Sequence, residues 1–121
     1  MKKIISKSFY FEAAHSLKIT KNQVNKNIHG HSYFVEVFVF DKTDEINKNG
    51  LLLDFSIFQK KLNVIKEDLD HKFLNEISGL EKPTLENIGL YIYKRLKKMD
   101  LHLYKILIKR KSCGETFILK V

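Results

Sequence analysis

Residues 28–33 read IHGHSY, and the expected sheet is built around them. His29 and His31 stand two apart at the entrance of a strand that we expect from Ser32 to Phe40. Side chains alternate along a strand, so the two imidazoles leave the same face. Gly30 has no Cβ, which lets the backbone bend or a ligand approach closely. The stretch therefore predicts a pair of converging imidazoles.

The strand from Ser32 to Phe40 is apolar on both faces, with Glu36 as the exception. One face carries Tyr33, Val35, Val37 and Val39, and the other carries Phe34, Phe38 and Phe40. A strand that is covered on both sides lies in a sheet with helices on one face and another layer, such as a partner chain, on the other.

A third imidazole comes from His15, which ends a strand expected over residues 3–15. Three imidazoles from two neighbouring strands form the protein half of a catalytic zinc site, whose fourth position stays open for water or substrate. A His-x-His pair alone is weak evidence, because ordinary domains hold many satisfied or exposed histidines. The spacing alone leaves both interpretations open.

The rest of the chain predicts two helices and a final hairpin. Asp54 caps the first helix and Pro83-Thr84 opens the second, each with an apolar stripe at steps of three and four residues. The expected stripes are Phe55, Phe58, Leu62, Ile65 and Leu69 in the first helix, and Leu85, Ile88, Ile92, Leu96 and Met99 in the second. Residues 103–111 and 116–121 alternate as two strands, while residues 16–28 and 41–50 are polar connections. A short extended run is expected at residues 51–53.

The expected element order is ββααββ. This pattern predicts one α+β domain over residues 1–121, with an antiparallel four-stranded sheet and both helices on one face. No stretch approaches the roughly 20 apolar residues of a membrane span. The start of the chain does not resemble a signal peptide, and Cys113 is the single cysteine. These features favour a cytoplasmic protein.

The net charge of +8 raises the question of nucleic acid binding. Lysine supplies nearly all of the positive charge and is scattered, and Arg95 and Arg110 are the only arginines. Arginine clusters and the aromatic-glycine signature of a single-strand-binding sheet are absent from the sequence, which argues against a nucleic acid partner. A positive field still attracts an anionic small substrate.

Five stretches in order carry a resemblance to a known family. They are FEAAH at 11–15, HGHSY at 29–33, LDF at 53–55, LDHKFLN at 69–75 and PTLEN at 83–87. With them the chain resembles the 6-pyruvoyl tetrahydropterin synthase family, which includes the 6-carboxytetrahydropterin synthases of the queuosine pathway.

The resemblance implies a T-fold, in which subunits join edge to edge into a barrel, typically a hexamer of two stacked trimers. It implies zinc bound by His15, His29 and His31, and a pterin bound where subunits meet. It also implies that Asp70 and His71 are catalytic in a lyase acting on the side chain of dihydroneopterin triphosphate. The alternative for His71 is a helix-terminal histidine that interacts with the helix dipole.

Two positions depart from the family pattern. Asn25 stands where family enzymes usually carry a catalytic cysteine, and residues 16–28 contain no cysteine, aspartate or glutamate. Arg110 stands where the family has a glutamate that pairs with the pterin. Glu115 and Glu86 are the candidates to replace that glutamate. The candidate substrate-binding residues are Thr84, Glu86 and Arg110, and the first two lie in the matching PTLEN stretch.

The sequence supports two functions. The first is a zinc-dependent pterin lyase in which His71, with a water or a lysine, replaces the missing cysteine. The second is a catalytically reduced paralogue that keeps the barrel and the metal but binds a different ligand, one with an acidic group facing Arg110.

Overall fold

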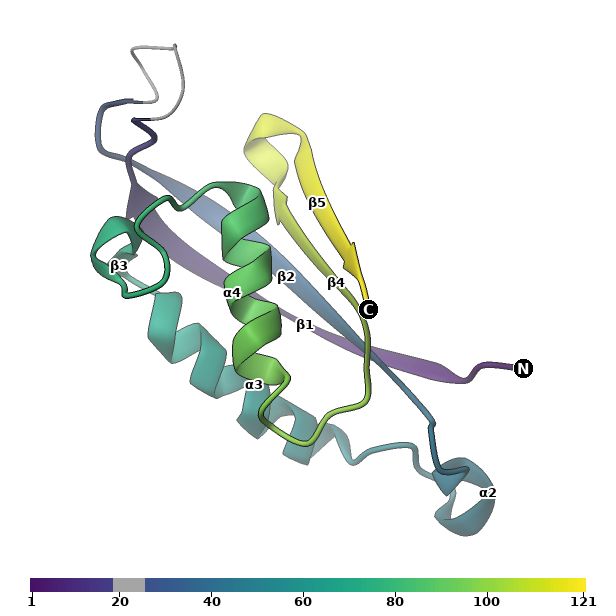
Figure 1. The fold of residues 1–121 in the computed structure, drawn as a ribbon. Coiled ribbons are helices and arrows are strands. Elements are labelled where there is room, and N and C mark those ends of the chain that lie inside the picture. Colours follow the sequence, from purple (N-terminus) through teal and green to yellow (C-terminus); the bar gives the residue numbers. More distant parts are fainter. Residues whose placement is uncertain (19–25) are drawn as a thin grey trace.

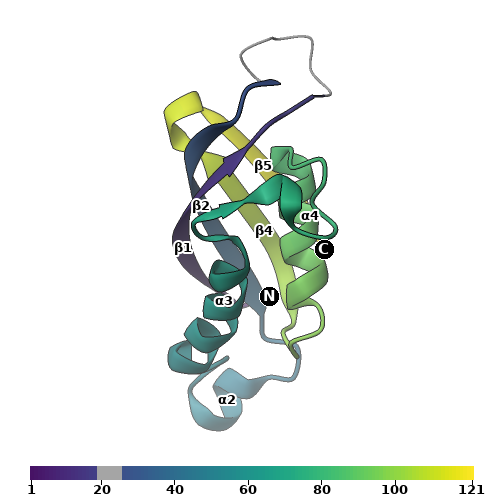
Figure 2. The ribbon, with the colours of Figure 1, turned by 90° about the vertical axis from the view of Figure 1, so that its left-hand side faces the viewer.

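The computed structural model describes residues 1–18 and 26–121. In this part of the chain, five strands form one sheet in the spatial order β3-β1-β2-β4-β5, and helices α3 and α4 cover one of its faces (Figures 1 and 2). The strands are β1 (Ile4–His15), β2 (His29–Phe40), β3 (Lys72–Phe73), β4 (Leu103–Arg110) and β5 (Glu115–Lys120). The helices are α2 (Glu45–Asn49), α3 (Phe55–Leu69) and α4 (Leu85–Leu96), and 3-10 turns span Leu74–Glu76 and Lys111–Cys113. The expected α+β class is confirmed.

Strands β1 and β2 are antiparallel neighbours along their whole length. Ile4 lies opposite Phe40 at one end of the pair, and His15 lies opposite His29 at the other. Strand β2 therefore begins three residues before the expected start at Ser32, because its pairing with β1 continues through the HGH stretch. This register brings His15 and His29 into direct opposition.

Both long helices begin at the predicted caps. The Asp54 carboxylate accepts a hydrogen bond from the Ser56 backbone N–H at 2.7 Å, and the Thr84 hydroxyl accepts one from Asn87 at 3.1 Å. The stripe of α3 is buried at Phe58, Leu62, Ile65 and Leu69, and that of α4 at Leu85, Ile88, Ile92 and Leu96. Phe55, expected in the first stripe, is instead exposed.

Helix α4 packs closely on the last strand of the sheet. A Cβ added at Gly89 would lie 2.6 Å from the Phe117 ring, a separation that real side chains do not show. Glycine at this position therefore lets the helix backbone approach β5. Strand β4 faces the same core through Ile106 and Ile108, which are fully buried.

The sheet contains one more strand than the four expected. Strand β3 pairs in parallel with β1. Lys72 lies opposite Ala13, the residue before Ala14. Two residues give no alternation pattern, so the strand depends on contacts distant in sequence. Asp70 accepts from the Glu12 backbone N–H at 2.9 Å, and the His71 backbone N–H donates to the Glu12 carbonyl at 2.6 Å.

The connection over residues 41–50 contains α2, which the sequence did not predict. The Asp41 carboxylate accepts from the backbone N–H groups of Glu45 and Ile46 at 2.8 and 3.1 Å, which satisfies the start of the helix. None of its residues is buried, so it has no apolar stripe for a periodicity argument to detect. The run at residues 51–53, expected to be extended, is a bend before α3.

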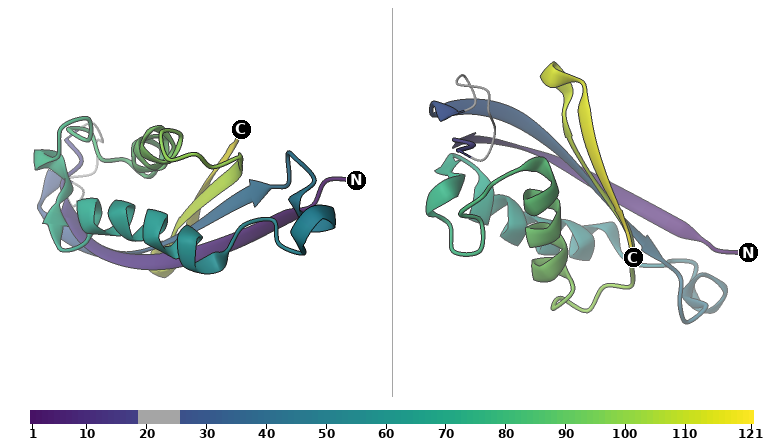
Figure 3. Two further views of the ribbon diagram at one scale, coloured as in Figure 1. Left: turned by 90° about the horizontal axis from the view of Figure 1, so that it is seen from below. Right: turned by 45° about the horizontal axis from the view of Figure 1, so that its top comes forward.

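Helices α3 and α4 leave the other face of the sheet without a covering helix (Figure 3), and this face carries aromatic side chains of β2. Phe34 and Phe38 are half-buried, and the ammonium groups of Lys111 and Lys105 lie 4.7 and 4.4 Å from their ring centroids. Glu36, the polar exception in the strand pattern, accepts a hydrogen bond from Ser6 at 2.7 Å. None of the helices in the described ranges is long and apolar enough to cross a membrane.

Candidate metal centre and ligand site

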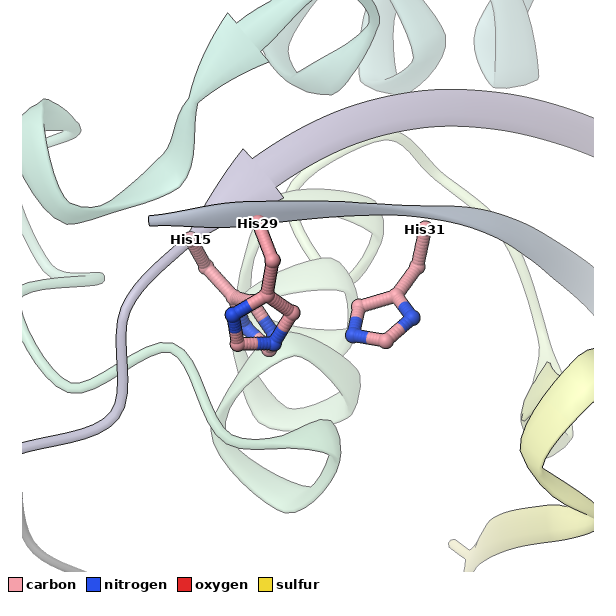
Figure 4. A group of neighbouring side chains, drawn as sticks. All are labelled: His15, His29 and His31. Carbon is pink, nitrogen blue, oxygen red and sulfur yellow. The ribbon is translucent and has the colours of Figure 1, made fainter. Parts of the chain in front are cut away.

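Three histidines converge at one end of the β1–β2 pair (Figure 4). His15 is the last residue of β1, and His29 and His31 lie on the first residues of β2. One nitrogen from each ring forms a group whose members all lie within 4.8 Å of one another, and the Nε2 atoms of His15 and His29 are 3.1 Å apart. This group could hold a metal ion.

The outer nitrogens of two rings are fixed by backbone carbonyls. His15 Nδ1 donates to the Pro83 carbonyl at 2.9 Å, and His29 Nδ1 donates to the Asn27 carbonyl at 2.7 Å. A carbonyl only accepts, so Nδ1 carries the proton in each ring and Nε2 of the neutral ring presents a lone pair. Two lone pairs facing each other at 3.1 Å repel, and a cation bound to both removes that repulsion.

Burial keeps two of the rings in the form that binds metal. His15 is fully buried, and this burial lowers the pKa of its ring to about 4. Burial, followed by the charges of Arg110 and His29, also lowers the pKa of His31. Metal ligation requires neutral imidazole, so both rings are ready to bind near pH 7.

The third ring has an unpaired nitrogen. His31 Nε2 is buried and has no hydrogen-bond partner among the described residues. A buried polar atom without a partner costs about 1–3 kcal/mol, and a bound metal would remove that cost. The orphaned nitrogen and the donor set of three imidazoles fit a zinc ion with a fourth position left for another ligand.

Asp70 and His71 form a hydrogen-bonded pair between the end of α3 and the start of β3. Asp70 Oδ2 lies 3.0 Å from His71 Nδ1, while Asp70 Oδ1 accepts from the Glu12 backbone N–H. That backbone hydrogen bond, together with His71, lowers the pKa of Asp70. His71 has a left-handed backbone with φ 58°, and its side chain is 80% exposed. The pair therefore presents a fixed imidazole to the outside of the chain.

His71 and His31 both line one cavity of about 690 Å³. Its other lining residues are Glu12, Ala13, Ala14, Gly30, Ser32, Lys72, Phe73 and Ser112. Glu12 and Ser32 lie opposite each other on neighbouring strands, and the Ser32 hydroxyl donates to the Glu12 carboxylate at 2.6 Å. The structure thus brings one metal-site histidine, His31, and His71 to the same cavity.

Arg110 ends β4 beside the three histidines. Its guanidinium Nη2 lies 2.8 Å from Glu115 Oε1, and the two residues are paired across the β4–β5 hairpin. The Arg110 side chain is only 12% exposed, and its charge lowers the pKa of both His15 and His31. A buried cation with one partner carboxylate therefore stands at the position where the resemblance implies a glutamate.

The other predicted ligand residues have different surroundings. Thr84 uses its hydroxyl to cap α4, and the adjacent Pro83 carbonyl holds His15. Glu86 is exposed in the first turn of α4. Asn25 lies outside the described residues.

Sequence reasoning did not place Tyr33 or Cys113 in the site. The Tyr33 hydroxyl is 3.4 Å from His15 Nδ1, and Cys113 Sγ is 3.9 Å from His31 Nδ1. Tyr33 shares the strand face of the histidines, so the alternation that placed it in the core also points it toward them. Cys113 reaches His31 through the turn after β4, and no local pattern could have indicated this.

The fold and this site define a class: α+β proteins whose long antiparallel strands bring three histidines together beside an Asp-His pair. Residues 4–117 match the family model described as 6-pyruvoyl tetrahydropterin synthase. The chain belongs to this family.

Individual relatives agree with the family model. A 6-carboxy-5,6,7,8-tetrahydropterin synthase from Synechocystis is 36% identical over 122 residues, covering 94% of this chain and 92% of the relative. A dihydroneopterin monophosphate aldolase from Pyrococcus furiosus is 39% identical over 88 residues, covering 73% and 69%. The structure of Caenorhabditis elegans 6-pyruvoyl tetrahydropterin synthase superposes with a TM-score of 0.81 at 25% identity, covering 100% of this chain and 96% of that one.

Proposed function

We propose that the protein is a zinc-dependent lyase that acts on the side chain of dihydroneopterin triphosphate. The observation that carries this proposal is the convergence of His15, His29 and His31, with the outer nitrogens of His15 and His29 fixed by backbone carbonyls. The similarity to a 6-carboxy-5,6,7,8-tetrahydropterin synthase along nearly the whole chain supports the substrate class. The similarity to a dihydroneopterin monophosphate aldolase makes cleavage of the side chain an alternative to phosphate elimination.

Zinc bound to the three imidazoles would supply a Lewis acid that stabilises negative charge developing on side-chain oxygens of the substrate. The protein groups around it have separate tasks. Pro83 and Asn27 hold the rings of His15 and His29 through their carbonyls. These contacts orient the two rings and fix the tautomer of each.

His71 is the candidate group for proton transfer in the proposed reaction. Its Nδ1 is held by Asp70, so Nε2 is left to exchange a proton with a substrate in the cavity that His71 and His31 share. A carboxylate partner fixes the orientation of an imidazole, and histidine is the side chain that most often transfers protons in enzymes.

Assembly would complete this site. The His71 side chain is 80% exposed in a single chain, and the uncovered face of the sheet carries half-buried aromatic rings. A second copy that covers this region would exclude water from the cavity, which strengthens electrostatic interactions with the substrate. We infer a closed homo-oligomer, a hexamer of two trimers, working in the cytoplasm without a nucleic acid partner.

The direct test is an assay of the zinc-loaded protein with dihydroneopterin triphosphate. The pterin product and released acetaldehyde are both measured, because acetaldehyde accompanies side-chain cleavage and distinguishes the two reaction outcomes. His71→Ala should lower turnover by about 10² to 10⁴ fold, the usual value of general acid-base catalysis. His102→Ala, at an exposed histidine, is the control. Normal turnover by His71→Ala would remove this residue from the mechanism.

A second candidate function is a reduced paralogue that binds zinc and a different small ligand. The observation that favours it is Arg110, whose buried positive charge is opposite to that of a pterin-anchoring glutamate. Two variants separate the candidates. If Asn25→Cys gains synthase activity, alone or combined with Arg110→Glu, the lyase assignment holds. If neither variant turns over or binds a pterin, the reduced paralogue takes its place.

A further inference from the structure

The Arg110 guanidinium is held in place beside the metal site. Arg110 follows Ile106 and Ile108 on the buried face of β4, the face that packs toward α4. The turn that follows it carries Cys113, whose sulfur is 3.9 Å from the ring of His31. Strand pairing of Phe34 with Lys109 also sets Arg110 next to Tyr33. Arg110 therefore borders the histidine group through its own strand, the adjoining turn and β2.

One donor of this guanidinium has no acceptor. Nη2 is paired with Glu115, but Nε is buried and has no partner within residues 1–18 and 26–121. Only two side-chain polar atoms in those residues are buried and unpaired, and the other is His31 Nε2. The lone pair of His31 Nε2 can be satisfied by a cation, and the N–H of Arg110 Nε can be satisfied by an anion.

The net charge around the three histidines also favours a negatively charged ligand. Three neutral imidazoles with a divalent metal carry two positive charges, and Arg110 is balanced by Glu115 alone. Residues 16–28, which connect His15 to His29 in the sequence, contain no acidic residue. Excess positive charge in a buried site favours a ligand that brings negative charge with it.

We propose that Arg110, oriented by Glu115, binds an anionic group of the ligand that occupies this site. The shared chemistry is an oxyanion, either a carboxylate or a phosphate, since both accept hydrogen bonds from guanidinium. The inference deepens the proposed function and rests on its location at the three histidines, but it does not depend on turnover. Arg110 would bind an anionic group of the ligand and not the pterin ring itself.

The test is calorimetric titration of the zinc-loaded protein with inorganic phosphate and, separately, with acetate. Arg110→Gln should weaken binding of the preferred anion roughly 10- to 100-fold, the range for one charge-assisted hydrogen bond. Arg110→Lys should bind with intermediate affinity, because it keeps the charge without the planar donor set.

Lys109→Gln is the matched control, since it removes the same charge from the next residue, which lies on the opposite face of β4. The affinity of Lys109→Gln for the preferred anion should stay within about twofold of that of the parent, because a solvent-screened charge contributes little. Circular dichroism checks that each variant is folded.

Two results would overturn the inference. One is equal affinity in the parent and a folded Arg110→Gln, and the other is a parent that binds neither anion at millimolar concentration. Either result leaves the proposed lyase testable, because turnover of dihydroneopterin triphosphate is measured independently. Conversely, an inactive protein that loses anion binding only in Arg110→Gln would keep the ligand assignment and reject the lyase.

Discussion

At the scale of single residues, each histidine is held by a different neighbour. His15 is fixed by the Pro83 carbonyl, His29 by the Asn27 carbonyl, and His31 stands beside Cys113. None of these three neighbours was named as a site residue from the sequence, because each acts through a backbone atom or a distant turn. The histidines themselves were predictable, since their residue type and strand spacing are visible in the chain.

Loss of one ring should abolish strong zinc binding. We expect His31→Ala to lower bound zinc well below half an equivalent per chain after reconstitution and dialysis, because two imidazoles bind zinc much more weakly than three. Elemental analysis of the purified protein measures the content, and His102→Ala, at an exposed histidine, should retain the parent value. Unchanged zinc in His31→Ala would show that the metal is bound elsewhere.

Asp70 makes a pH-dependent contribution to stability. Its folded-state pKa is lowered, chiefly by the Glu12 backbone N–H. The carboxylate therefore stabilises the fold fully above its ordinary value of 3.8, and this contribution is lost as the pH falls through the lower folded-state pKa. Asp70→Asn should lower the denaturation midpoint at pH 7 and differ less from the parent near pH 3. Glu67→Gln, at an exposed acid on α3, is the control.

A difference between Asp70→Asn and the parent that stays constant from pH 7 to pH 3 would contradict this role. A constant difference would mean that Asp70→Asn loses the same stabilising contact at every pH, and that the negative charge of the Asp70 carboxylate adds nothing to stability.

At the scale of elements, strong local patterns were predictable and contact-dependent pieces were not. The caps Asp54 and Thr84 located both long helices, because each cap is a property of adjacent residues. Strand β3 was not predictable because it consists of two residues that pair with Ala13 and Ala14, which are distant in sequence. Helix α2 was not predictable because none of its residues is buried. The exposed position of Phe55 likewise depends on how α3 begins, which its spacing does not reveal.

The cap of α4 links helix stability to the metal site. Thr84→Ala should lower the free energy of unfolding by about 1 kcal/mol, the usual value of a lost cap. Because the adjacent Pro83 carbonyl holds His15, we also expect severalfold weaker zinc binding. Thr84→Ser keeps a hydroxyl and should behave as the parent. Equal stability of Thr84→Ala and the parent in urea denaturation would rule out the cap as a contributor.

At the scale of the whole molecule, the uncovered aromatic face calls for a partner surface. Phe34 and Phe38 lie half-buried opposite the helices, and the outer strands β3 and β5 leave unpaired edges in a single chain. The sequence indicated this surface, since β2 is apolar on both faces. It could not define the assembly, because edge-to-edge joining depends on the shapes of complete subunits.

We therefore expect a closed oligomer with a mass near six times the 14.3 kDa of the chain. Light scattering coupled to size-exclusion chromatography measures this mass. Phe38→Glu should shift the distribution toward smaller species, because it places a charge on the surface that the oligomer buries. A parent protein that stays monomeric at micromolar concentration would contradict the closed barrel.

In the function that we propose, the three histidines hold the metal on which pterin chemistry depends. The most direct measurement is a titration of metal-free protein with zinc while consumption of dihydroneopterin triphosphate is followed. We predict that the rate rises in proportion to added zinc and reaches a plateau at one zinc per chain, with no rise in His31→Ala. A rate that is independent of zinc, or no consumption at one bound zinc per chain, would contradict the account.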